Sequence, residues 1–183
     1  VINPADVRDI HDVMKQRRIF KPCADRLDQP ISVNEIRKVM DRLPLGKQAG
    51  PNRIPNGVYR VLSKFFSPYL YRVFKEARKN GKLPENMLEG DITLLFKKKD
   101  RSDVRNYRPL TMLNTDYKIY TKILANRLKT VVHQLVSECQ KGFVPKTFIA
   151  ECSMLQHLIE AWINEAPTER EGLFIFLDME KAF

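Results

Sequence analysis

Apolar residues recur three or four positions apart in five stretches of the chain, a spacing that places side chains on one face of an α-helix. This spacing predicts helices at residues 33–43, 56–65, 68–80, 115–128 and 149–164. At 92–96 and 173–177 the apolar residues are instead adjacent and often β-branched or aromatic, which is typical of strands. Residues 1–30 have weak periodicity and predict only a helix or an extended arm. The pattern therefore predicts the α+β class, with several helices and a small amount of sheet.

Capping residues mark the ends of two of these helices. Ser32 and Glu35 have the spacing of a capping box, in which each side chain accepts a hydrogen bond from a free backbone N–H. Ser67 and Pro68 suit the N-cap and the first position of the helix at 68–80. Asn80-Gly81 suits its C-terminal end, because glycine adopts the left-handed conformation that often ends a helix.

The remaining helices are bounded less sharply. Glycines and prolines at 45–55 predict a defined loop. Thr115 is a candidate cap for the helix that follows it, and we expect that helix to continue or kink as far as Leu135. In the helix at 149–164, four residues share a face that we expect to lie inward: Leu155, Leu158, Ile159 and Trp162.

Residues 91–113 predict a β-hairpin with a basic tip. Residues 92–96 form its first strand and 105–113 its second extended segment, in which Pro109 keeps Arg108 extended and indicates a sheet edge. Six basic residues lie within twelve positions: Lys97, Lys98, Lys99, Arg101, Arg105 and Arg108. Such side chains can hold a phosphate chain between two strands, and arginine can bind phosphate with two hydrogen bonds. They equally suit a solvated edge that discourages pairing with another chain.

The apolar run at 173–177, expected to be a fully buried strand, ends at Asp178. A carboxylate at the carboxyl end of a strand lies where α/β architectures place ligands, and its oxygens suit Mg²⁺. Two such ions can hold the attacking and leaving oxygens of a phosphoryl transfer. Glu180 could contribute only if the strand continues. The alternative is that Asp178 caps a helix beginning near Lys181.

The charge of the chain is positive and uneven. The sequence has 32 Lys and Arg against 22 Asp and Glu, a formal net charge of +10. Residues 91–130 carry 10 basic against 4 acidic side chains, whereas residues 151–183 carry 2 against 7. A positive body with an acidic final segment suits a protein that binds a polyanion, although solvated helix faces could account for most of the lysines. A hydrophobic fraction of 43% supports a packed core and excludes wholesale disorder.

Several protein classes are disfavoured. The cysteines, Cys23, Cys139 and Cys152, are odd in number and lack C-x-x-C spacing, which argues against a disulfide framework or a zinc site. No apolar stretch approaches the roughly 18 residues of a membrane span, and the first residues have no signal-peptide pattern. We therefore expect an intracellular protein with no membrane partner. Because the chain lacks an initiator methionine and stops at D-M-E-K-A-F, we also expect a piece of a longer protein.

Five segments occur in an informative order. They are K-Q-A-G-P-N-R-I-P at 47–55, I-T-L-L-F-K-K-K-D with N-Y-R-P-L-T-M-L-N at 92–114, D-Y-K-I-Y-T-K-I-L-A-N-R-L at 116–128, Q-K-G-F-V-P at 140–145 and F-L-D-M-E-K-A-F at 176–183. This series resembles the reverse transcriptases of LINE-type (non-LTR) retrotransposons from about Ile31 to Phe183. The segment at 92–114 is similar to the fingers hairpin of that family, and the last segment to its first catalytic motif.

The resemblance implies a catalytic and metal-binding site at the end of the chain. Asp178 would be the first of the metal-binding aspartates, with the main-chain carbonyl of Met179 as a second ligand. The cofactor would be Mg²⁺ (or Mn²⁺). Phe183 falls where the family has an aromatic steric gate that crowds a ribonucleotide 2′-OH and so favours dNTPs.

The resemblance also implies dNTP-binding residues in the hairpin. Lys97 and Arg108 would hold the incoming triphosphate. Lys98 and Arg105 are alternates, because the sequence leaves a one-residue shift of register open.

Two further segments would lie near the nucleic acid. The expected template contacts are Gly50, Pro51, Asn52, Arg53, Gln140, Gly142, Phe143 and Lys146. Asn52 and Arg53 stand where the family often has Asp and Gly, a departure expected to weaken a tight turn. Lys146-Thr147 stands where the family often has Gly-Arg, so an expected basic contact depends on Lys146.

The resemblance implies a fold and a reaction. We expect an N-terminal arm at 1–30, a fingers region at 31–172 and the start of the palm at 173–183, with an incomplete palm and no thumb. The longer parent would be an RNA-directed DNA polymerase acting on an RNA template, a DNA primer and dNTPs, with the nucleus as its expected location. The isolated chain, without the paired-aspartate motif, is not expected to polymerise. The alternatives are a non-catalytic basic nucleic-acid-binding remnant of a retroelement and an unstable product whose strand at 173–177 is an exposed edge.

Overall fold

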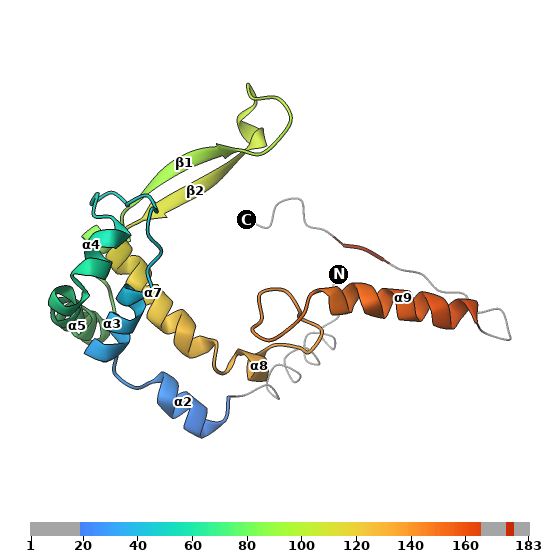
Figure 1. Ribbon diagram of the computed structural model, residues 1–183, viewed down its shortest axis with the longest axis horizontal. Helices are drawn as coiled ribbons and strands as arrows, with labels where there is room; N and C mark the ends of the chain where they lie inside the picture. The colour runs from blue at the N-terminus through green and yellow to red at the C-terminus, as the bar shows by residue number, and fades with distance from the viewer. Residues whose placement is uncertain (1–18, 166–174, 178–183) are drawn as a thin grey trace, which may run out of the picture. The chain divides into compact units, whose positions relative to one another are not determined.

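The computed structural model describes residues 19–165 and 175–177, and its elements fall into two compact units, residues 1–135 and residues 136–183. In the first unit the elements are α2 (Lys21–Leu27), α3 (Val33–Asp41), α4 (Asn56–Val61), α5 (Ser63–Asn80), α6 (Glu85–Leu88), β1 (Gly90–Phe96), the 3-10 helix η1 (Val104–Asn106), β2 (Tyr107–Leu113), α7 (Thr115–Leu128) and α8 (Val132–Leu135). The second unit contains α9 (Ala150–Asn164) (Figure 1). Helices with one two-stranded antiparallel sheet confirm the predicted α+β class.

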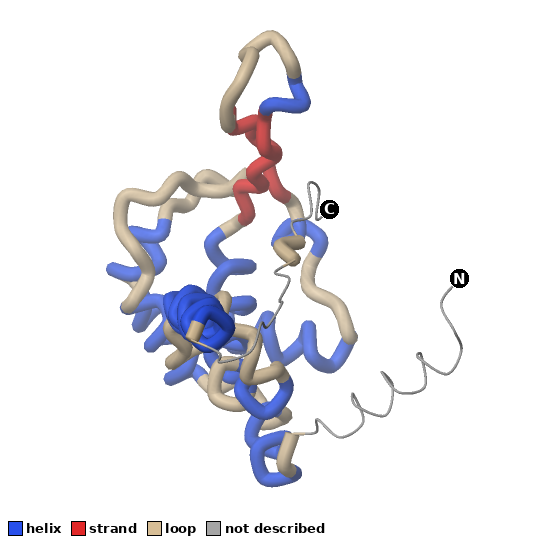
Figure 2. The backbone as a smooth tube through the Cα atoms, turned by 90° about the vertical axis from the view of Figure 1, so that its right-hand side faces the viewer, coloured by secondary structure: helices blue, strands red, loops and turns tan. Residues whose placement is uncertain are grey.

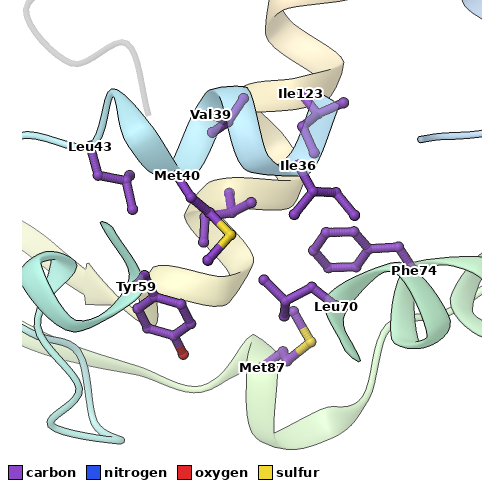
Figure 3. Packing of buried hydrophobic residues seen from close by; sticks show 10 residues of the cluster. Ile36, Val39, Met40, Leu43, Tyr59, Leu70, Phe74, Met87 and Ile123 are labelled. Atoms are coloured by element: carbon purple, nitrogen blue, oxygen red, sulfur yellow. The ribbon is translucent and has the colours of Figure 1, made fainter. Parts of the chain in front are cut away.

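The core of the first unit lies among α3, α5 and α7. Ile36 and Met40 of α3 and Phe74 of α5 are at most 1% exposed, and Figure 3 shows their side chains pointing toward one another and toward Leu70. From α7, Ile119 and Ile123 complete this cluster. Full burial of a side chain of this size contributes about 1.5–3 kcal/mol relative to leaving it exposed. The predicted apolar faces of α3 and α5 are therefore confirmed, and that of α7 is confirmed in part, because Leu124 and Leu128 are 43% and 48% exposed.

The capping box at the start of α3 is also confirmed. The backbone N–H of Glu35 donates to the Ser32 hydroxyl at 3.2 Å, and the backbone N–H of Ser32 donates to the Glu35 carboxylate at 3.0 Å. The same carboxylate receives hydrogen bonds from the Arg127 guanidinium at 2.8 and 2.9 Å. This arginine also donates to the carbonyl oxygens of Leu27 and Pro30, so one side chain ties α7 to α3 and to the segment before it.

The start of α5 differs from the prediction. Ser67 and Pro68 were expected to begin the helix, but α5 begins at Ser63 and Pro68 lies inside it. A proline there removes one intrahelical hydrogen bond, yet the helix continues because both sides of the break pack on the core. Ser67 is 1% exposed for the same reason, and the C-terminal end at Gly81, with φ of 71°, is as predicted.

The helix predicted at 56–65 is also divided. α4 ends at Val61 and α5 follows after Leu62, so the apolar positions do not share one face. Val61 and Phe65 are 82% and 58% exposed, whereas Tyr59, at 5%, enters the core. The change of helix direction at Leu62 rotates the expected face away from the core.

The predicted hairpin forms, with its strands paired from Gly90 opposite Leu113 to Phe96 opposite Tyr107. Figure 2 shows the two strands extending from the helices of the first unit, with the connecting loop at their far end. Because successive side chains alternate between faces, partners directly opposite each other share a face. The hairpin thus presents two distinct faces, and each residue's face follows from the register.

Asn114, and not Thr115, is the N-cap residue of α7. Asn114 is 2% exposed, and Thr115 is fully buried and donates to the carbonyl oxygen of Ile54 and to Asn56 Oδ1. The Thr115 hydroxyl therefore bonds to residues at the end of the preceding loop and does not cap the helix. The helix stops at Leu128, and α8 follows as a separate short helix, which confirms an interruption before Leu135.

In the second unit, the helix predicted at 149–164 is confirmed as α9, but its expected inward face is not buried. Leu155, Leu158, Ile159 and Trp162 are 58%, 65%, 38% and 61% exposed. Residues 175–177 of the expected buried strand belong to no described strand and are at least 72% exposed. A strand requires a neighbour for its backbone hydrogen bonds, and the paired strands among the described residues are β1 and β2 alone.

None of the described helices is both long enough and apolar enough to cross a membrane.

Candidate functional site

The loop at the end of the hairpin is held by its own hydrogen bonds. The backbone N–H of Lys97 donates to the Asn106 carbonyl at 2.9 Å, which extends the ladder one residue beyond β1. The Asn106 side chain donates to the Asp100 carbonyl at 2.8 Å, and the Tyr107 hydroxyl donates to the Arg101 carbonyl at 2.9 Å. These bonds fix the loop backbone, so its basic side chains project from a defined support.

The register places Lys97 and Arg108 on one face of the hairpin. Arg108 lies directly opposite Leu95. Lys97 is two positions beyond Leu95 and remains in the ladder, so it continues the face that carries Leu95 and Arg108. Lys98 is one position further along and does not continue this alternation. The ladder therefore places Lys97 and Arg108 on one face, and it ends before Lys98 and Arg105.

Arg105 is already paired inside the loop. Its guanidinium donates to both carboxylate oxygens of Asp103 at 3.0 and 3.1 Å. Mainly because of this contact, the pKa of Asp103 is lowered from its ordinary value. Arg101 lies over the Phe96 ring at 4.9 Å from the centroid. Lys97 and Arg108 have no such internal partner among the described residues, so their charge is available to a ligand.

Residues 50–53 form a turn against the junction of β2 and α7. The backbone N–H of Arg53 donates to the Gly50 carbonyl at 2.8 Å, and that of Asn52 donates to Asn114 Oδ1 at 3.0 Å. A Cβ on Gly50 would lie 2.5 Å from the backbone carbon of Leu113, so only glycine permits this approach. The turn thus forms although Arg53 replaces the glycine frequent in the resembling family, and Arg53 has a φ of 57°.

Asn114 is a residue that the sequence reasoning missed. In addition to accepting from Asn52, its side chain donates to the Asn86 carbonyl at 2.9 Å. It therefore joins the turn at 50–53, the segment before β1 and the start of α7. The signal for it was its place as the last residue of the N-Y-R-P-L-T-M-L-N segment, directly after a strand.

Tyr59 and Asp116 lie close to this junction. Burial, with the charge of Asp116 as the next cause, raises the pKa of Tyr59 to about 12. Burial also raises the pKa of Asp116. Tyr59 is thus a neutral phenol at physiological pH, and it suits a structural role in the core.

In the second unit, the predicted template residues lie in the loop before α9. Gln140 Nε2 donates to the Gly142 carbonyl at 3.0 Å, and Phe143 is fully exposed. Phe143 and Lys146 have φ of 62° and 66°, and Lys146 stands where the resembling family often has glycine. The Thr147 hydroxyl donates to the carbonyl oxygens of Lys141 and Val144, each at 2.7 Å, which holds the loop closed.

Asp178, Met179 and Phe183 lie outside the described residues, as do Glu180 and Lys181. In the part of the chain that the structure describes, no group of three His, Cys, Asp or Glu side chains could hold a metal ion. Cys23, Cys139 and Cys152 are free thiols.

The sequence pattern of the reverse transcriptase (RNA-dependent DNA polymerase) family matches residues 96–183, from the end of β1 to the last residue. Over this range, the chain belongs to the reverse transcriptase family. The match covers the hairpin loop, β2 and the loop before α9, so it confirms the resemblance that those segments carry.

Proteins of mobile elements are similar over a larger part of the chain. The Transposon TX1 uncharacterized 149 kDa protein of Xenopus laevis is 30% identical over 189 aligned residues and covers the whole chain. The Retrovirus-related Pol polyprotein from type-1 retrotransposable element R2 of Nasonia vitripennis is 28% identical over 85% of the chain. The RNA-directed DNA polymerase from mobile element jockey of Drosophila melanogaster is 25% identical over 84%. The chain spans only 14%, 14% and 17% of the lengths of these three curated relatives.

Proposed function

We propose that the chain is the fingers and the start of the palm of a LINE-type reverse transcriptase, which copies RNA into DNA in its full-length form. In this assignment residues 1–30 are an N-terminal arm, 31–172 the fingers and 173–183 the first palm strand. The observation that carries the proposal is the shared face of Lys97 and Arg108, on a hairpin within a reverse transcriptase family segment. The similarity to an RNA-directed DNA polymerase supports the reaction class.

The proposed reaction is nucleotidyl transfer. The 3′-OH of a DNA primer attacks the α-phosphate of a dNTP and pyrophosphate leaves. Lys97 and Arg108 hold the triphosphate, and their positive charges stabilise the negative charge that develops on the leaving oxygens. The aromatic side chain of Phe183 favours a deoxyribose. The turn at 50–53 and the loop that carries Gln140, Gly142, Phe143 and Lys146 contact the template.

The proposed cofactor is a divalent metal ion, Mg²⁺ or Mn²⁺. The carboxylate of Asp178 and the carbonyl of Met179 are hard oxygen donors, so their chemistry fits such an ion. When bound, the ion supplies Lewis-acid stabilisation of the phosphate oxygens. Asp178 is the catalytic residue in this proposal, because its carboxylate would hold the ion against the reacting phosphate.

Arginine variants of the hairpin test the dNTP site in the full-length parent. Arg108→Ala is expected to raise the KM for dNTP about tenfold or more, since a hydrogen bond to a charged group is worth about 1.5–3 kcal/mol. Arg105→Ala removes the same charge from η1, three positions before Arg108, and is the matched control. It is expected to have a smaller effect, because Arg105 is engaged by Asp103. Equal effects of the two variants would contradict the assignment to Arg108.

Asp178→Asn tests the reaction itself. The variant is expected to lose primer extension on an RNA template while keeping its affinity for that RNA. Normal extension by Asp178→Asn would overturn the catalytic role. The uneven charge favours a second candidate, a non-catalytic basic module that binds nucleic acid, since residues 91–130 carry 10 basic against 4 acidic side chains. A wild-type parent that binds RNA without extending a primer would favour that candidate.

A further inference from the structure

A cavity of about 530 Å³ lies in the first unit, between α5, α7 and the segment at 27–31 that joins α2 to α3. Sites for small molecules usually measure roughly 300–1,000 Å³, so the cavity has the size of such a site. Its lining contains no residue of the hairpin, of the turn at 50–53 or of the loop before α9. The cavity is therefore separate from the candidate site described above.

Three aromatic side chains form much of the apolar wall of the cavity: Tyr71, Phe74 and Tyr120. Phe74 is 1% exposed, and its ring meets that of Tyr120 with the centroids 4.9 Å apart and an angle of 57° between the planes. Tyr71 and Tyr120 pack against the same core but are only partly buried. Aromatic rings favour such tilted contacts with a further ring, so the wall suits a planar aromatic occupant.

The charged residues of the lining leave an excess of one positive charge. The basic residues are Lys75, Arg78 and Arg127, and the acidic residue is Asp28. The Arg127 guanidinium is compensated by Glu35 at 2.8 Å, so two cations remain against one carboxylate, a net charge of +1. In the part of the chain that the structure describes, neither Lys75 nor Arg78 forms an ion pair. The cavity therefore favours a ligand with a single negative charge.

The two available cations are neighbours on α5. Lys75 and Arg78 are three positions apart, a spacing that places side chains next to each other on a helix. Arg78 donates one hydrogen bond to the Asp28 carbonyl, and a guanidinium has five N–H groups, so further donors remain. Together they can bind the two oxygens of one carboxylate.

We propose that this cavity binds an aromatic carboxylate. The ring of the ligand lies among Tyr71, Phe74 and Tyr120, and its carboxylate accepts hydrogen bonds from Lys75 and Arg78. This assignment goes beyond the proposed function and does not depend on it, because the two sites share no residue.

The test measures binding of 2-naphthoate to the 183-residue chain by isothermal titration calorimetry at neutral pH. The neutral amide 2-naphthamide is the matched ligand, because it has the same rings without the charge. Leu124→Trp fills the cavity from α7, and Leu128→Trp is its control, since Leu128 is similarly exposed one turn later and does not line the cavity. Thermal unfolding of each variant establishes that it keeps the wild-type fold.

The wild-type chain is expected to bind 2-naphthoate with a Kd of about 1 mM or lower, as befits a ligand of this size. Leu124→Trp is expected to weaken binding about tenfold or more, whereas Leu128→Trp leaves it unchanged. Undiminished binding by a folded Leu124→Trp variant would place the ligand elsewhere, for example on the exposed face of α9, and would overturn the proposal.

A second pair of variants tests the charge and does not alter the apolar wall. Lys75→Gln is expected to weaken binding of 2-naphthoate about tenfold, because it removes a charged hydrogen bond, and to leave binding of 2-naphthamide unchanged. Lys79→Gln removes the same charge from an exposed position of α5 outside the cavity and is expected to change neither. The assignment fails if the wild-type chain binds the two ligands equally, if it does not bind 2-naphthoate, or if Lys75→Gln and Lys79→Gln have equal effects.

Discussion

Helices α3 and α9 are both amphipathic in sequence, yet they differ in what their apolar faces contact. In α3, Ile36 and Met40 are fully buried against α5 and α7. In α9 none of the residues is buried, and Leu158 is 65% exposed. Helical spacing thus identifies the face that favours burial, whereas burial itself depends on a second element packing against that face.

The polar contacts of the two units also differ, in how far apart in the sequence their partners lie. In the first unit, Arg127 binds Glu35 across 92 positions and Asn52 binds Asn114 across 62. In the second unit, Lys141 pairs with Glu151 and Gln156 with Glu160, which are close in sequence. Contacts between distant residues make an unfolding transition cooperative, so we expect the first unit to unfold as one body.

The largest expected effect compares two leucines in these helical faces. Leu70→Ala in α5 is expected to destabilise the first unit by about 2–5 kcal/mol, because Leu70 is 8% exposed and its loss leaves a cavity. Leu158→Ala in α9 is the matched control and is expected to cost less than about 0.5 kcal/mol. Urea denaturation of the chain measures both. A comparable cost for Leu158→Ala would show that the α9 face is buried in solution.

The next effect concerns the turn that packs on the first unit. Gly50→Ala is expected to cost about 1–3 kcal/mol, because its Cβ would meet backbone atoms of Leu113 and Asn114 at 2.5 and 2.6 Å. Gly57→Ala in α4 places its Cβ 3.7 Å from the Leu45 side chain and is expected to stabilise the helix slightly. Opposite signs in the shift of the denaturation midpoint would confirm the close approach, and equal shifts would refute it.

A smaller effect is the dependence of stability on pH, which we expect in the first unit and not in the second. The hydrogen bond from Arg127 lowers the pKa of Glu35 below its ordinary value of 4.5. The ionised carboxylate is therefore favoured in the folded state, so its stabilisation is complete above pH 4.5 and is lost as the pH falls through the lower folded pKa.

Glu35→Gln is accordingly expected to cost about 1 kcal/mol at pH 7 and much less at pH 3, a modest value because the Glu35 side chain is 36% exposed. Glu151→Gln, which breaks the local pair with Lys141, is the control and is expected to leave the transition unchanged at both pH values. Denaturation midpoints at the two pH values measure the difference. If Glu35→Gln lowers the stability by the same amount at pH 3 and pH 7, the role of the ionised carboxylate is contradicted.

Local signals predicted the parts of the fold that depend on local physics. The capping box at Ser32, the end of α5 at Gly81 and the hairpin follow from side chains close in sequence. The predicted start of α5 at Ser67 and Pro68 was wrong, because core packing outweighs the cost of Pro68 inside a helix. The prediction that the apolar face of α9 is buried was wrong, because a helical pattern contains no information about which element packs against that face.

The candidate site was predictable to the same degree. The resemblance identified the basic hairpin, but a sequence cannot fix register, and the structure was needed to place Lys97 and Arg108 on one face. Asn114 was missed because its partners, Asn52 and Asn86, lie 62 and 28 positions away.

The smallest effect concerns two basic residues with left-handed backbone, one in each unit. Arg53 and Lys146 have φ of 57° and 66°, and both stand where the resembling family often has glycine. A residue with a Cβ pays roughly 1–2 kcal/mol in this conformation, while glycine loses about 0.4–1 kcal/mol more backbone entropy on folding. Arg53→Gly is therefore expected to stabilise the first unit by up to about 1 kcal/mol, a rise in Tm of about 2–4 °C.

Lys146→Gly relieves the same strain in a loop held by local contacts, so we expect it to leave the cooperative transition of the first unit unchanged. Differential scanning calorimetry of both variants decides the matter: a Tm raised by Lys146→Gly as much as by Arg53→Gly would mean that the two units unfold together, and the contrast between α3 and α9 would then have no energetic counterpart.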